Sequence, residues 1–137
     1  MPNEAKQRLT VWWILWAAFQ IGIFVIYHFL SRTSAQPQPP SAASATWLAG
    51  FAPFFVSTII RWGVLPRVAR AQAAFPLFII GIAMAEASCF LGLFIFPAHQ
   101  QELFMLSVLG IFQFVPCFAR RYFTLHGHHA PNQSEKP

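Results

Sequence analysis

The sequence predicts an all-α integral membrane protein in which four transmembrane helices form one bundle, with residues 1–137 making up a single membrane domain. Hydrophobic residues make up 56% of the chain and charged residues only 9%, whereas an ordinary soluble domain carries about 25% charged residues. Four apolar runs approach or reach the roughly 20 residues that cross a hydrocarbon core about 30 Å thick. The basic residues flank these runs, so the formal charge of +5 does not indicate a nucleic-acid partner.

The apolar runs occupy residues 9–30, 47–64, 75–96 and 102–118. In the first run, tryptophans near one end and Tyr27 near the other are typical of aromatic rings at the two headgroup levels. Pro53 predicts a kink within the second run. The third run places Pro76 at its first helical position, and Pro97 closes it. Because the next connection is short, the third and fourth runs are predicted to form a tight antiparallel hairpin.

The segments outside the runs have polar or low-complexity sequences. Residues 31–46, rich in Pro, Ser, Ala and Gln, are expected to form an external linker, and residues 124–137 a disordered cytoplasmic tail. A cleaved secretory signal peptide is an alternative interpretation of the first run, because a basic lead-in precedes it and small residues follow it. Both interpretations stay open at this point.

Positive charge is distributed unevenly between the two sides of the predicted membrane. The amino terminus, the middle connection and the carboxyl tail together carry Lys6, Arg8, Arg61, Arg67, Arg70, Arg120, Arg121 and Lys136, whereas the two opposite connections carry only Arg32. Cytoplasmic segments are enriched in Lys and Arg. We therefore expect a multi-pass protein of the bacterial inner (plasma) membrane with both termini in the cytoplasm.

One acidic residue, Glu86, lies near the middle of the third run. A carboxylate at that depth costs about 2.5 kcal/mol or more, so it usually has a partner or a task. The interpretations are a neutral, protonated carboxyl that donates a hydrogen bond, a proton- or ion-carrying carboxyl, and a general acid or base, although no second acid is nearby. Candidate members of an ion or hydrogen-bond site around it are Arg61, Gln113, Gln20 and Ser107, with Ser57, Thr58 and Ser88 at similar depth.

Arg61 has two possible roles at the cytoplasmic side of the second run. Its side chain either extends to the headgroups beside Trp62 or bonds to Glu86 or Gln113.

The third run also contains a stripe of small residues. Gly81, Ala85, Ser88 and Gly92 fall on one side of the predicted helix, which favours close approach of a neighbouring helix.

The segment GIAMAEASCFLGLF at residues 81–94 resembles the carboxyl-bearing helix of the proteolipid c subunit of rotary ATP synthases, in which an acid among alanines precedes glycine. That resemblance implies that Glu86 is an ion-carrying position. The chain departs from the family in having four runs instead of a hairpin, and its second run lacks alternate glycines. As a whole, the chain resembles small four-span bacterial inner-membrane proteins that have no assigned activity.

No cofactor or metal is expected. His126, His128 and His129 lie in the tail without a neighbouring acid or thiol, and Cys89 and Cys117 differ in depth by roughly 15 Å, which is too far for a disulfide. The leading expectation is a non-enzymatic, structural or accessory membrane protein that contacts lipid and either further copies of itself or other membrane subunits. The alternative is a proton- or cation-coupled transport component that uses Glu86 as carrier.

Overall fold

The computed structural model describes residues 2–33, 45–119 and 122. In that part of the chain every regular element is helical, as the sequence predicts. The main helices are α1 (Pro2–Thr33), α2 (Ala52–Ile59), α3 (Ala71–Phe94) and α4 (Gln100–Phe112). Short helices extend or connect them: η1 (Ala45–Phe51), η2 (Ile60–Val64), η3 (Leu65–Arg67), η4 (Pro97–His99) and η5 (Pro116–Ala119). Residues 34–44 of the predicted external linker and the whole of the predicted tail, 124–137, lie outside the described residues. The ends of the predicted linker are helical, because residues 31–33 belong to α1 and residues 45–46 to η1.

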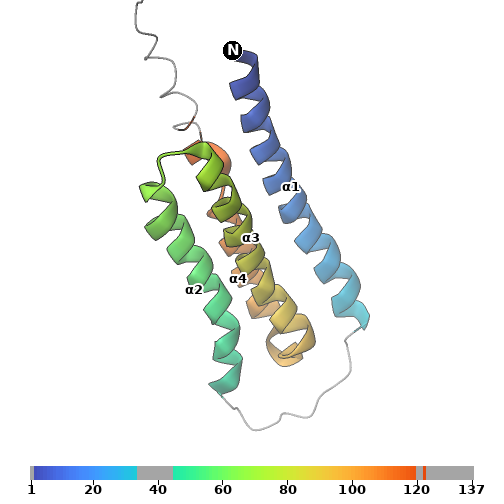
Figure 1. Ribbon diagram of the computed structural model, residues 1–137. Helices are drawn as coiled ribbons and strands as arrows, with labels where there is room; N and C mark the ends of the chain where they lie inside the picture. The colour runs from blue at the N-terminus through green and yellow to red at the C-terminus, as the bar shows by residue number, and fades with distance from the viewer. Residues whose placement is uncertain (1, 34–44, 120–121, 123–137) are drawn as a thin grey trace, which may run out of the picture.

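Four helical segments of the described chain are long and apolar enough to cross a membrane. They are Lys6–Arg32, Thr46–Arg67, Ala71–Phe94 and Pro97–Ala119. Consecutive segments run in opposite directions, so the start of α1 and the end of α4 lie at the same end of the bundle (Figure 1). We call this the amino-terminal end, and it also contains the connection between η3 and α3 (Figure 1).

The helices extend beyond the apolar runs. α3 begins at Ala71, so Pro76 is inside the helix and not at its first position. The reason is that the preceding residues, 71–74, are Ala and Gln, which favour helix without adding to the apolar run. α1 likewise begins at Pro2, ahead of the first run.

The second segment changes helix type along its length. It begins as the 3₁₀ helix η1, continues as α2, and passes through the π-helical turn η2 into the 3₁₀ turn η3. Pro53 stands at the start of α2, where a missing N–H removes no helical hydrogen bond. In place of a kink within one helix, Pro53 therefore lies next to the junction between η1 and α2.

α3 and α4 pack closely along the stripe of small residues. All four stripe positions, Gly81, Ala85, Ser88 and Gly92, are buried. A Cβ atom on Gly81 would overlap the ring of Phe114, one on Gly92 would come within 2.9 Å of Leu103, and one on Gly110 within 2.7 Å of Ala85. Both backbones therefore approach each other more closely than larger residues would allow.

α1 associates with the other helices through large rings. Trp12 is buried, and its ring centroid lies 4.7 Å from that of Phe78 and 5.4 Å from that of Phe75, both on α3. Tyr27 stacks on Phe104 of α4 at 3.9 Å. Figure 1 shows α1 as a long helix beside the other three. In this arrangement α2 and α1 lie on opposite sides of α3.

Candidate functional site

A cluster of polar side chains joins the second half of the α2 segment to the end of α4. We call it the polar cluster, and its members are Ser57, Thr58, Arg61, Trp62 and Gln113. The Gln113 side-chain amide is its hub: its oxygen accepts from Trp62 Nε1 at 3.2 Å, and its nitrogen donates to Ser57 Oγ at 3.3 Å and to Thr58 Oγ1 at 3.4 Å.

The hydroxyl groups of the polar cluster extend it to α3 and back to α2. Ser57, fully buried, donates to the main-chain oxygen of Gly81 at 2.8 Å. Thr58 donates to the main-chain oxygen of Phe54, one turn earlier, at 2.9 Å. Three helices therefore share one set of hydrogen bonds. In apolar surroundings a buried donor or acceptor that lost its partner would destabilise the bundle.

Arg61 closes the polar cluster at the carboxyl end of α4. Its Nε donates to the main-chain oxygen of Gln113 at 2.6 Å. Gln113 is the C-cap of α4, where carbonyl groups lack helical partners and the helix dipole is negative. A guanidinium cation satisfies both requirements, and it also lies 4.3 Å from the centroid of the Phe118 ring and 4.8 Å from that of Trp62.

The π-helical turn η2 determines where Arg61 and Trp62 point. Both residues lie in this turn, which spans Ile60–Val64. A π turn inserts an extra residue into the helix and rotates the following side chains relative to an α-helix, and such turns are frequent at functional sites. No sequence signal for this turn was available, because the residues IRWGV have no pattern that separates π from α geometry.

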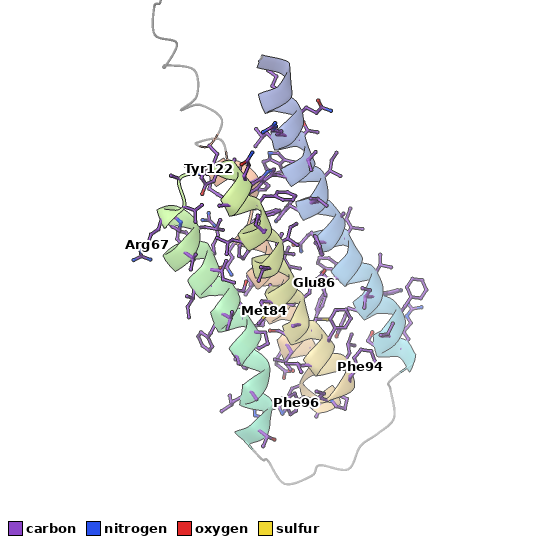
Figure 2. The ribbon with its side chains drawn as sticks, in the orientation of Figure 1. Arg67, Met84, Glu86, Phe94, Phe96 and Tyr122 are labelled. Atoms are coloured by element: carbon purple, nitrogen blue, oxygen red, sulfur yellow. The ribbon has the colours of Figure 1, made fainter. Side chains whose placement is uncertain are left out.

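Glu86 lies outside the polar cluster. It is half-buried on the side of α3 that faces α1 (Figure 2). Gly81, whose carbonyl bonds to Ser57, is five residues earlier, which is about 140° around the helix. The structure therefore does not bring Glu86 together with Arg61 or Gln113, because α3 itself separates them.

The proposed partners of Glu86 bond to other groups or, in the described chain, have no hydrogen-bond partner at their side-chain oxygens. Within residues 2–33, 45–119 and 122, the Glu86 carboxyl makes no hydrogen bond or ion pair. The expected hydrogen bond to Gln113 or Ser107 is thus absent from the described chain. Gln20 follows Trp16 by one turn, and the Trp16 indole donates to the Ile111 oxygen of α4 at 3.0 Å, so Gln20 lies on the side of α1 that turns toward α4.

Ser88 and Ser107 belong to the seam between α3 and α4. The contact of Ala85 with Gly110 sets the antiparallel register, and three residues along each helix it places Ser88 opposite Ser107. Both side chains are fully buried, and neither hydroxyl oxygen has a hydrogen-bond partner in the described chain. The side-chain oxygen of Gln20 is also buried without a partner there.

Outside the polar cluster, two further hydrogen bonds join distant segments and were not anticipated from the sequence. One is the bond from Trp16 to α4, and the other runs from the Tyr122 hydroxyl to the Leu65 oxygen at 2.9 Å. The only available signal was the presence of amphipathic rings near the ends of the apolar runs.

The chemistry of the remaining candidates is limited. Cys89 and Cys117 are free thiols, as expected. Among the described residues no group of three or more His, Cys, Asp or Glu side chains is placed to hold a metal ion, and the tail histidines lie outside those residues.

No protein-family model matches the chain, and no curated protein or solved structure matches it either.

Proposed function

We propose that this chain is a multi-pass protein of the bacterial inner membrane, without enzymatic activity, that has a structural or accessory role. In this proposal both termini face the cytoplasm, because eight of the nine Lys and Arg residues fall on that side. Its contacts are lipid and either other membrane subunits or further copies of the chain.

The polar cluster is the observation that carries the structural role. Its side chains bond to each other and to main-chain carbonyls of three helices, so they hold α2, α3 and α4 in one arrangement. A transport path or a catalytic centre needs polar groups that remain available to a substrate. In the polar cluster these groups are used to fix the bundle.

The outer surface supports contact with lipid or with apolar surfaces of partner subunits. Large hydrophobic side chains are exposed on every main helix, and water would solvate them poorly. The most exposed include Ile14, Ile21 and Phe29 on α1, Phe55 and Ile59 on α2, Phe94 on α3, and Leu109 and Phe112 on α4. Figure 2 shows side chains of this kind projecting outward along the bundle.

Reconstitution tests the structural role against transport. The full chain is placed in liposomes that contain a pH-sensitive dye, and an imposed pH or cation gradient is followed with time. We expect leakage equal to that of protein-free liposomes, and no difference between the native chain and the Glu86→Gln variant. A flux that the native chain supports and Glu86→Gln abolishes would contradict the structural role.

One observation favours the alternative of a proton- or cation-coupled transport component. The Glu86 carboxyl is half-buried and has no partner in the described chain, so it remains free to take up and release a proton. Carbodiimides react with protonated carboxyl groups in apolar surroundings. Under this alternative, labelling is selective for Glu86 and weakens as the pH rises, and Glu86→Gln removes it. Absence of labelling at any pH would count against a carrier role.

A further inference from the structure

An open groove lies between residues 8–12 of α1 and the start of α3, at the amino-terminal end. It encloses about 380 Å³ and is lined by Arg8, Val11, Trp12, Ala71, Gln72 and Phe75. That volume is within the range of about 300–1,000 Å³ found for small-molecule sites. The groove is separate from the polar cluster, since α2 contributes no lining residue.

Among the described lining residues one is charged, and it is a cation. Arg8 is exposed, and among the described side chains it forms no hydrogen bond or ion pair. Gln72 adds an exposed side-chain amide from α3, and none of the described lining residues is acidic. A guanidinium group and an amide are donors suited to the oxygens of a phosphate group.

The remaining lining is apolar and aromatic. Trp12 and Phe75 form an edge-to-face pair with centroids 5.4 Å apart, and Val11 is exposed beside them. The groove therefore combines a cation near the end of the bundle with an apolar wall toward its middle. An anionic molecule with a hydrocarbon chain complements both parts.

The position in the bundle identifies the source of such a molecule. Arg8 immediately precedes the first apolar run, and exposed Lys6, Arg67 and Arg70 lie at the same end, as residues at headgroup depth would. Basic pockets between transmembrane helices on the cytoplasmic side bind anionic lipid headgroups. The start of α3 also contributes partial positive charge from its first N–H groups.

We propose that this groove binds one anionic phospholipid, with its phosphate at Arg8 and Gln72 and an acyl chain along Val11, Trp12 and Phe75. The proposal rests on the membrane insertion proposed above. In this proposal α1 and α3 form the two walls of the site, so a bound lipid would contact both helices.

Native mass spectrometry of the full chain in detergent tests the site. The protein is titrated with phosphatidylglycerol and, separately, with phosphatidylcholine of identical acyl chains. We expect a saturable single-lipid complex with phosphatidylglycerol and markedly weaker binding of phosphatidylcholine. Arg8→Gln should weaken phosphatidylglycerol binding about five- to ten-fold, the effect of removing one charged contact.

Two variants separate the groove from general basic charge. Lys6→Gln is the matched control, because Lys6 is two residues from Arg8 and so about 200° around α1, on its other side. It should weaken binding less than two-fold. Val11→Trp keeps the cation but fills the groove, and it should prevent the complex.

Several outcomes would overturn the proposal. Equal losses in Arg8→Gln and Lys6→Gln would indicate a diffuse electrostatic effect, and retained binding in Val11→Trp would show that the lipid lies elsewhere. Displacement of the lipid by millimolar glycerol phosphate would indicate a site for soluble phosphates. Flotation of the protein with liposomes is measured in parallel: loss of lipid selectivity with normal flotation rejects only this site, whereas failure to float rejects membrane insertion.

Discussion

The helix α1 and the unit formed by α2, α3 and α4 are held in the bundle by different interactions. The three-helix unit has glycines and alanines at its contacts and a shared set of hydrogen bonds in the polar cluster. α1 contacts this unit mainly through aromatic rings, with one described side-chain hydrogen bond from Trp16. In lipid, apolar surface alone gives little drive for helix association, so close packing and hydrogen bonds decide its strength. We therefore expect the three-helix unit to be the more stable part.

The largest expected effect is at the seam between α3 and α4. Gly110→Leu should destabilise the bundle by about 3 kcal/mol, because the new side chain has to displace Ala85, which cannot move away without moving its backbone. The free energy of unfolding is measured in mixed micelles by titration with sodium dodecyl sulfate, followed by circular dichroism. Gly22→Leu on α1 is the control: no atom lies within 4 Å of a Cβ there, so it should be neutral or slightly stabilising. Equal destabilisation by both substitutions would show that the α3–α4 seam is no more sensitive to added volume than α1.

The next effect concerns the cation of the polar cluster. Arg61→Met should lower the free energy of unfolding by about 2 kcal/mol, because it leaves the Gln113 carbonyl without its charged donor. Arg67→Met is the matched control, since exposed Arg67 bonds only within its own helical turn to the Gly63 oxygen. It should change stability by less than about 0.5 kcal/mol. The same detergent titration measures both variants, and a neutral Arg61→Met would mean that Arg61 does not stabilise the bundle.

A smaller effect is expected where α1 meets α4. Trp16→Phe keeps an aromatic ring but removes the donor to the Ile111 oxygen, and it should reduce stability by about 1 kcal/mol. Trp13→Phe changes the same atoms at a half-buried position where the indole makes no described hydrogen bond, so it should have less effect. Cross-linking between single cysteines on α1 and α4 gives a second readout. Indistinguishable results for the two variants would show that the hydrogen bond from Trp16 does not help to hold α1 against α4.

The smallest effect is expected at Glu86. Because its carboxyl has no partner in the described chain, Glu86→Gln and Glu86→Leu should differ in stability by less than about 0.5 kcal/mol. This differs from the expectation for a hydrogen-bonded acid, for which Glu86→Leu would strand a buried partner and cost about 1–3 kcal/mol. A Glu86→Leu variant that unfolds much more readily than Glu86→Gln would show that the acid does stabilise the bundle. The comparison uses expression level and detergent titration together.

Hydropathy was sufficient to predict an all-helical chain with four segments long and apolar enough to cross a membrane. A run of apolar residues long enough to span a membrane is expected to form a helix, because in lipid its main-chain groups have to form hydrogen bonds within the segment. The small residues around Ala85 also marked the face of α3 that packs against α4. Helix starts were less predictable, as Ala71 shows, since residues with high helix propensity extend a helix beyond its apolar part.

The environment of Glu86 could not be predicted from the sequence. Helical periodicity gives the angle between Glu86 and Ala85, but it does not say which neighbouring helix lies on which side. Depth placed Arg61, Gln113 and Glu86 near one another, whereas the structure has α3 between them. The π turn at Ile60–Val64 adds a rotation that the sequence does not encode in a recognisable pattern.

The arrangement of the four spans in the membrane is the central claim, and cysteine labelling tests it most directly. Cys89 and Cys117 are replaced by serine, and single cysteines are introduced at Ser41, Ala69, Ala98 and Ser134 in turn. A membrane-impermeant maleimide is then applied to intact spheroplasts. We predict labelling at Ser41 and Ala98, and labelling at Ala69 and Ser134 only after permeabilisation. Labelling of Ala69 in intact spheroplasts, or of all four positions alike, would contradict the account.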